Sequence, residues 1–252
     1  MKRIIILTGS ELRHDFFRRV VAGAHDCMLT YCESVMPLED SDHLRARAQS
    51  EGDFFGLSKL LIDRSWPRHI PRGEINDHAP HIIDWNPDLV ICYGASIINP
   101  PLIEAFRGRF INCHLGLSPY LRGAATNFQA LVAGQPELVG ASFLHMSKGI
   151  DEGEIIHQIR PVIYPDDSPH QIGNRLIYGM TMTCCRLIDE WDRLEPMPQL
   201  AGPSKTWRIR DAGAEAVELM RSNFAIDMIP RYLADKTERD RAWPIVQQRV
   251  LG

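Results

Sequence analysis

The sequence lacks a long hydrophobic run, and this bears on where the protein acts. No apolar stretch approaches the roughly 20 residues that a membrane-spanning helix needs. Met1-Lys2-Arg3 followed by Ile4 to Leu7 has the order of a signal peptide, but its apolar part is too short and a charged segment follows at once. We therefore expect a cytoplasmic protein with no membrane partner.

The sequence also lacks an excess of basic residues and any paired cysteine motif. Its 28 Lys and Arg face 32 Asp and Glu, so no general basic field is available and no nucleic-acid partner is expected. The six cysteines form no C-x-x-C pair, and four lie in apolar patterns, which predicts reduced, mostly buried thiols. His145, His157 and His170 lack ligand spacing, and no metal site is expected.

What the sequence does contain is typical of a globular protein, with 44% apolar and 24% charged residues over 252 positions. Branched apolar runs at Arg3 to Leu7, Cys27 to Cys32 and Pro87 to Gly94 have the length of buried parallel strands. Helical spacing follows the first run, with Ser10 as the expected cap. Strands that alternate with helices predict an α/β fold, a Rossmann-like and mostly parallel sheet flanked by helices.

The remaining segments predict longer helices and a short extension. The stretch from His43 to Ser65 indicates a long helix interrupted at Gly52 and Gly56. Its leucine and aromatic positions are assigned to the core: Phe54, Phe55, Leu57, Leu60 and Leu61. Pro67 to Pro71 is expected to break the chain, and Ser168 to cap an amphipathic helix that reaches Trp191. Prolines then mark a linker, which predicts a domain over residues 1–200 and a C-terminal extension over 201–252.

The stretch from Phe110 to Asp151 contains the candidate catalytic residues. Asn112 and His114 lie two residues apart after a short apolar run, and on an extended strand this spacing aims both side chains at the same side. An amide and an imidazole that converge suit a carbonyl whose oxygen gains negative charge as the carbon is attacked. Asp151, in a turn with Gly149 and Gly153, is the candidate for the anion that completes such a site.

With these residues in view, the segment resembles the formyltransferases that use 10-formyltetrahydrofolate. This group includes glycinamide ribonucleotide, methionyl-tRNA and amino-sugar formyltransferases. The matching motifs are Asn112-Cys113-His114, Gly116-Leu117-Ser118-Pro119, Arg122-Gly123-Ala124-Ala125 and Asp151-Glu152-Gly153-Glu154-Ile155-Ile156. Three catalytic positions in order, at family-like separations, are a more specific signal than N-x-H alone.

The resemblance implies an enzyme of the formyltransferase fold with 10-formyltetrahydrofolate as co-substrate. It would transfer the formyl group to the primary amine of a small acceptor, such as an amino sugar nucleotide or an amino-acid-like metabolite. Asn112 and His114 would donate to the oxyanion, while Asp151 would orient His114 and accept the proton. The expected folate-binding residues are Tyr93, Ser96, Ile97, Ile98, Gly116, Leu117, Ser118, Pro119, Lys148 and Ile150, and the expected acceptor-binding residues are Ser10, Arg122 and Gly123.

Two other functions stay open, a formyltetrahydrofolate hydrolase that releases formate and a folate-binding module without turnover. Glu11 places a carboxylate where purine-pathway members carry a phosphate loop, which disfavours glycinamide ribonucleotide. About fifty residues after position 200 are too few for the C-terminal barrel of the methionyl-tRNA enzymes. Arg122 could hold an anionic part of the acceptor or pair with a surface carboxylate, and the extension could supply a homodimer interface.

Overall fold

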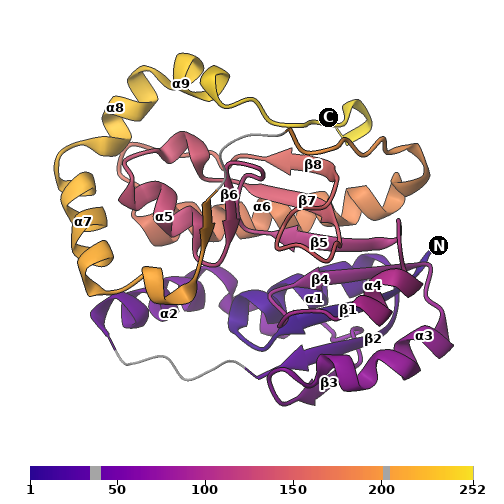
Figure 1. Ribbon diagram of the computed structural model, residues 1–252. Coiled ribbons are helices and arrows are strands. Elements are labelled where there is room, and N and C mark those ends of the chain that lie inside the picture. Colours follow the sequence, from indigo (N-terminus) through magenta and orange to yellow (C-terminus); the bar gives the residue numbers. More distant parts are fainter. Residues whose placement is uncertain (35–40, 201–204, 252) are drawn as a thin grey trace.

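A seven-stranded sheet runs through the centre of the computed structural model, which describes residues 1–34, 41–200 and 205–251 (Figure 1). The strand order is β3-β2-β1-β4-β5-β7-β8; β7 and β8 run antiparallel to their neighbours and the other pairs are parallel. The predicted α/β class and mostly parallel sheet are confirmed. The strands are β1 (Arg3–Gly9), β2 (Asp26–Glu33), β3 (Pro67–Ile70), β4 (Leu89–Tyr93), β5 (Phe110–His114), β7 (Ala141–His145) and β8 (Ile155–Ile159).

Helices cover both faces of the sheet (Figure 1). On one face lie α1 (Leu12–Ala24) and α6 (Pro169–Asp189), and on the other α3 (Ala79–Trp85) and α4 (Pro100–Ala105). Side chains of β1 alternate between the two layers, since Ile4 and Ile6 pack with the first and Ile5 and Leu7 with the second. Burial on both faces is the reason that this strand is apolar without interruption.

Three parallel strands end at one edge of the sheet. The register pairs Thr8 of β1 with Tyr93 of β4, and Cys92 of β4 with Asn112 of β5. His114, the last residue of β5, pairs with Ser142 of β7. Ligands of open α/β sheets bind outside the carboxyl ends of such strands. The fold therefore brings the Asn112 and His114 positions to an edge suited to a binding site.

The expected cap of the first helix is wrong by one residue. The N-cap of α1 is Glu11, whose backbone N–H donates to Nδ1 of His14 at 3.3 Å. Ser10 lies one position earlier and is exposed. The helix therefore starts with an acidic side chain, which the positive end of the helix dipole favours.

The segment from His43 to Ser65 also differs from expectation. Helix α2 (Asp42–Phe55) continues through Gly52, and a 3₁₀ turn over Gly56–Leu60 replaces the rest of the helix. Because the turn changes the helical period, Leu57 and Leu60 face solvent and are 79% and 81% exposed, so their assignment to the core is wrong. Phe55 is buried as predicted, whereas Phe54 and Leu61 are partly exposed at 43% and 47%.

Pro67 to Pro71 forms a strand as well as a break. Residues Pro67–Ile70 are the edge strand β3, which pairs in parallel with β2. A proline at the first position of an edge strand costs no ladder hydrogen bond inside the sheet. The sequence pattern hid this strand because four residues are too few to show a period.

The C-terminal segment, by which we mean the residues after α6, packs against the part of the chain that forms the sheet. Strand β9 (Lys205–Trp207) pairs with β6 (Leu121–Gly123), and the helices that follow wrap around α5 (Thr126–Val132) in Figure 1. They are α7 (Ala214–Ala225), α8 (Met228–Ala234) and α9 (Lys236–Ala242). Tyr232 of α8 is only 1% exposed and belongs to the same core as α1 and α6. The division after residue 200 stays a prediction, and residues 201–204 lie outside the described part of the chain.

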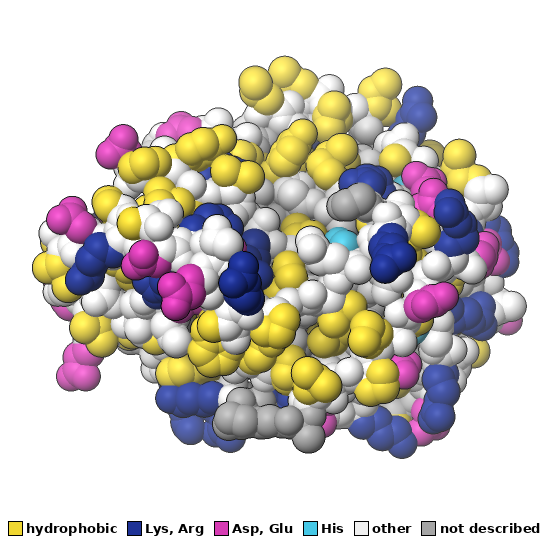
Figure 2. Space-filling view, turned by 90° about the horizontal axis from the view of Figure 1, so that it is seen from above, with side chains coloured by type: hydrophobic (Ala, Val, Ile, Leu, Met, Phe, Trp, Pro, Cys, Tyr) yellow, Lys and Arg dark blue, Asp and Glu magenta, His cyan; other side chains and the backbone are white. Residues whose placement is uncertain are grey.

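The cysteines, the helices and the surface can each be compared with expectation. All six cysteines are free and buried, as predicted. None of the helices in the described ranges is long and apolar enough to cross a membrane. Seen from above, basic, acidic and apolar side chains of the described residues are interspersed (Figure 2).

The His157 contact with the C-terminal segment predicts an acid-sensitive stability. The Nδ1 atom of His157 accepts the N–H of Gln248 at 3.0 Å, and burial, aided by Arg186, lowers the pKa of His157 from 6.5 to about 4. The folded state favours the neutral ring of His157. The contribution of this ring to the free energy of unfolding is therefore present above pH 6.5 and is lost as the pH falls towards 4. From neutral pH to about pH 4.5, the melting midpoint should fall by roughly 2–4 °C more for the wild type than for His157→Gln. Equal falls in calorimetry would contradict this assignment.

Candidate active site

The carboxylate of Asp151 joins three segments of the chain. Its Oδ1 accepts from Nδ2 of Asn112 at 2.8 Å, and its Oδ2 accepts from the backbone N–H of Gly123 at 2.8 Å. Oδ2 also lies 3.3 Å from Nδ1 of His114. The structure thus brings the Asn112, His114 and Asp151 side chains together.

The backbone of Asp151 is in a conformation that residues other than glycine seldom adopt. Its φ is +52°, whereas neither Gly149 nor Gly153 has a positive φ. The turn is therefore made at the aspartate itself. Gly153 serves another purpose, because a Cβ there would overlap the carbonyl of His145. Unusual backbone conformations of this kind persist where surrounding contacts fix them, and they are common at functional sites.

His114 is enclosed, with 7% of its surface exposed. Its Nε2 lies 3.2 Å from the carbonyl of Leu121, so both ring nitrogens face acceptors. Gly116 packs directly against the ring, and a Cβ at that position would overlap Nε2 of His114 and the hydroxyl of Thr126. The position of the imidazole therefore requires glycine at position 116.

The first turn of α1 carries a compact ion-pair network. Arg13 contacts Glu11 and, at 2.8 Å, Glu51, while Arg47 contacts Glu11 at 2.7 Å. Burial, together with Arg13 and Arg47, lowers the pKa of His14 well below its ordinary value, so this ring is neutral. The two acids and two arginines balance one another, and the carboxylate of Glu11 occupies the helix N-terminus at which an anion would otherwise bind.

A family comparison bears on this arrangement. The protein-family model described as formyl transferase matches residues 67–178 of the chain. This range includes Asn112, His114 and Asp151. This segment is therefore similar to formyl transferases. A methionyl-tRNA formyltransferase from Heliobacterium modesticaldum is 36% identical over 113 residues, which cover 44% of this chain and 35% of that protein. The chain thus spans about a third of that relative's length.

Solved structures resemble most of the chain in fold, although their sequence identity to it is low. A sugar N-formyltransferase from Shewanella sp. superposes with a TM-score of 0.59 at 17% identity, covering 89% of this chain and 88% of the other. A formyltransferase from Anoxybacillus kamchatkensis, in complex with UDP-4,6-dideoxy-4-formamido-L-AltNAc and tetrahydrofolate, gives 0.52 at 20% identity, covering 83% and 87%. At these identities the likeness establishes the fold alone.

The loop after β4, within the segment that matches the formyl transferase model, combines buried and exposed residues. Tyr93 is buried, burial raises the pKa of its hydroxyl, and its backbone carbonyl accepts the hydroxyl of Thr8 at 2.7 Å. Ile98 is buried too, whereas Ile97 is 78% exposed. Ser96 donates its N–H and its hydroxyl to the carboxylate of Glu33, at 2.6 and 2.7 Å.

The two other predicted folate-binding segments also differ in exposure. The side chains of Leu117 and Ser118 are fully buried, and Pro119, which follows a cis peptide bond, is partly buried. On the Asp151 loop, Ile150 is 52% exposed, and Lys148 forms an ion pair with Glu104 of α4 at 2.7 Å. The roles of these residues in folate binding stay predictions.

Of the predicted acceptor residues, Arg122 and Gly123 both lie on β6, whereas Ser10 lies between β1 and α1. Arg122 pairs with Glu152 at 3.2 Å and donates to Gln199 at 2.6 Å. Its role in acceptor binding stays a prediction. Gly123 has a φ of +91°, and a Cβ there would overlap the carbonyl of Trp207. Ser10 is exposed beside Glu11.

Sequence reasoning missed Glu33, Asn76 and Gln199. Glu33 is fully buried at the end of β2, and besides Ser96 it accepts the N–H groups of Gly73 and Ile75 at 3.0 and 3.3 Å. Asn76 donates to the carbonyl of Ile97 and accepts the N–H of Asn99. An acid at the end of an apolar strand was a readable signal for Glu33, whereas the contacts of Asn76 and Gln199 had no local signal.

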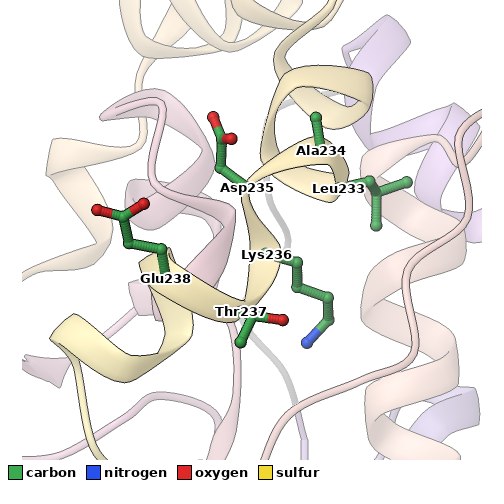
Figure 3. Close-up of a pocket in the computed structure, with 6 residues that line it drawn as sticks. All are labelled: Leu233, Ala234, Asp235, Lys236, Thr237 and Glu238. Atoms are coloured by element: carbon green, nitrogen blue, oxygen red, sulfur yellow. The ribbon is translucent and has the colours of Figure 1, made fainter.

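The hollow drawn in Figure 3 belongs to another part of the molecule. Six consecutive residues, Leu233 to Glu238, line it at the junction of α8 and α9. It shares no lining residue with the Asp151 site. Among residues 1–34, 41–200 and 205–251, no group of three or more His, Cys, Asp or Glu side chains is arranged to hold a metal ion.

The hydrogen bonds of Glu33 predict how fast backbone amides near it exchange with solvent. Glu33→Gln keeps the size of the side chain but replaces one acceptor oxygen by an NH₂ donor, which would face a donor already present. We expect amide hydrogen exchange at Ser96 and Ile75 to become faster by roughly tenfold, with β1 unchanged. Unchanged protection at Ser96 would show that other contacts hold the loop.

Proposed function

We propose that this chain is an N-formyltransferase that transfers the formyl group of 10-formyltetrahydrofolate to the primary amine of a small acceptor. One observation carries the proposal: the Asp151 carboxylate lies against both the Asn112 amide and the His114 ring, within the segment that matches the formyl transferase model. The three groups together offer hydrogen-bond donors for an oxyanion and a base for a proton.

Two exposed apolar side chains, one of them next to Asp151, are suited to contact a folate. Ile97, on the loop held by Glu33 and Asn76, and Ile150, next to Asp151, are both exposed. A planar pteridine or benzoyl ring that covered such side chains would remove apolar surface from water. The tetrahydrofolate in the Anoxybacillus structure supports the same co-substrate here.

The residues then divide the work of the transfer. The lone pair of a neutral amine attacks the formyl carbon, and the electrons of the C=O bond move onto its oxygen. The second N–H of the Asn112 amide, beyond the one given to Asp151, would donate to that oxygen. The carboxylate of Asp151 would take the proton from the attacking nitrogen, directly or through water. The C=O bond then re-forms as the bond from the formyl carbon to the folate nitrogen breaks, and that nitrogen would take up the proton that Asp151 received from the amine.

His114 would act from the other side of the carboxylate. A ring with protons on both nitrogens would satisfy Asp151 and the Leu121 carbonyl together, because only the cationic form donates twice. To donate to the oxyanion, Nε2 must exchange its contact with Leu121 for one with the substrate. Each such donor is worth about 3 kcal/mol of barrier in a dry, preorganised site.

A small acceptor is supported by two observations. The Shewanella sugar N-formyltransferase superposes on this chain over 88% of its own length. The carboxylate of Glu11 occupies the start of α1, where a phosphate would otherwise bind, and this argues against glycinamide ribonucleotide. An amine linked to a sugar nucleotide is therefore the acceptor class that we favour.

The direct test is an acceptor screen. The full chain would be incubated with 10-formyltetrahydrofolate and, separately, with nucleotide-linked amino sugars, free amino sugars, glycinamide ribonucleotide and methionyl-tRNA. We expect tetrahydrofolate to form together with the mass gain of one formyl group on an amino sugar nucleotide. Formate release without an amine would favour the hydrolase, and binding without consumption would favour the folate-binding module.

Variants of the three polar residues test the assigned roles. Asn112→Ala, His114→Ala and Asp151→Asn should each lower kcat by roughly 10²-fold or more, because each removes a group that acts in the transition state. The dissociation constant for the folate, measured by fluorescence, should change little. Near-normal turnover of Asp151→Asn would rule out its role as the base.

A further inference from the structure

The loop that carries Asp151 is held by a residue outside the segment that matches the formyl transferase model. Gln199 lies beyond residue 178, where that match ends. Its Nε2 donates to the carbonyls of Asp151 and Gly153, each at 2.7 Å, and its Oε1 accepts from Nη2 of Arg122 at 2.6 Å. One carboxamide thus contacts the residue that bears the carboxylate and the strand that carries Gly123.

The neighbouring contacts fix the segment that carries Gln199. Two residues earlier, Met197 exchanges backbone hydrogen bonds with Ile155 at 2.7 and 2.8 Å. Farther along, the carbonyl of Trp207 in β9 accepts the N–H of Ala124 at 2.9 Å. The C-terminal segment is therefore bound on both sides of Gln199 to the elements that surround Asp151.

The carboxylate of Asp151 needs such external support. With a φ of +52°, its backbone is in a region that costs free energy for a residue other than glycine. A change in the carbonyl direction of Asp151 would turn the carboxylate away from Asn112, His114 and Gly123 together. The two hydrogen bonds from Gln199 act on the carbonyls at positions 151 and 153, on both sides of Glu152.

We propose that Gln199 is a positioning residue for the Asp151 carboxylate, through its hydrogen bonds to the Asp151 loop and to Arg122. This inference rests on the proposed formyl transfer, and it assigns part of the C-terminal segment to the active site. Gln199 touches no reacting atom; it sets the orientation of the base and of the Gly123 N–H. Misplacement of a catalytic group by about 1 Å can cost on the order of 10²-fold in rate.

The carboxamide is the group that these contacts require. A glutamate at position 199 could still accept from Arg122 but would face the carbonyls of Asp151 and Gly153 without a donor. A methionine would fill similar space and make none of the three bonds. The two replacements therefore separate the contact with Arg122 from the contacts with the loop.

Gln248 offers a matched control in the same C-terminal segment. Its Nε2 donates to the carbonyls of Ile156 and Glu195, at 3.0 and 2.7 Å, and its Oε1 accepts the N–H of Glu195 at 3.2 Å. It makes the same kind of bridge between backbone groups but does not touch the Asp151 loop. Gln248→Met should therefore report the purely structural cost of losing such a bridge.

The experiment compares Gln199→Met, Gln199→Glu and Gln248→Met with the wild type, using the amino sugar nucleotide that turns over fastest in the screen. Both Gln199 variants should lower kcat by roughly tenfold or more while KM for 10-formyltetrahydrofolate stays within about twofold. Gln248→Met should keep kcat even if its melting midpoint falls as far. In an NMR spectrum, the amide proton of Gly123 should shift in the Gln199 variants and stay in place in Gln248→Met.

Two outcomes distinguish failure of this inference from failure of the proposed function. If the wild type turns over, Asp151→Asn does not, and the Gln199 variants match Gln248→Met in kcat and in the Gly123 resonance, the positioning role is wrong. If the wild type transfers no formyl group to any acceptor, the proposed function fails. In that case the Gly123 resonance still decides whether Gln199 orients the carboxylate.

Discussion

The carboxylate of Asp151 is the contact on which the candidate site depends. Its two oxygens hold Asn112 from β5 and Gly123 from β6, and Oδ2 also faces the His114 ring. A carboxylate that is nine-tenths buried is stable in the fold only if donors surround it, because removal of an ion from water costs several kcal/mol. The donors and the acid therefore stabilise one another, and the geometry of the site follows from that mutual need.

Two side chains outside this group fix the loops on either side of it. Glu33 joins the loop after β4 to the segment after β3, because it accepts two hydrogen bonds from Ser96 and one each from Gly73 and Ile75. Gln199 holds the Asp151 loop through two carbonyls. Both satisfy backbone groups that would otherwise lack partners in a protected environment, and both join segments that are distant along the chain. A buried polar network of this kind limits the loops to one arrangement, which a site with charged groups requires.

Local patterns predicted the sheet better than its surroundings. Continuous apolar runs gave β1 and β4 because strands buried on both faces have no polar face to show. The same reasoning failed for Leu57 and Leu60, whose spacing indicated a core helix although a 3₁₀ turn exposes them. It also missed β3, since a four-residue edge strand that begins with proline has the composition of a loop.

The sequence by itself determined the strand that carries Asn112 and His114, their common side, and the residue types that suit formyl transfer, because strand period and side-chain chemistry are local properties. Only the tertiary structure decided which groups meet them. The bond from Asn112 to Asp151 spans 39 positions and the bond from Gln199 to Asp151 spans 48. Such pairs depend on how β5, β6 and the C-terminal segment pack, and on a left-handed residue at position 151 that no periodic pattern records. The chain alone thus specifies the chemical groups, and the fold specifies their partners.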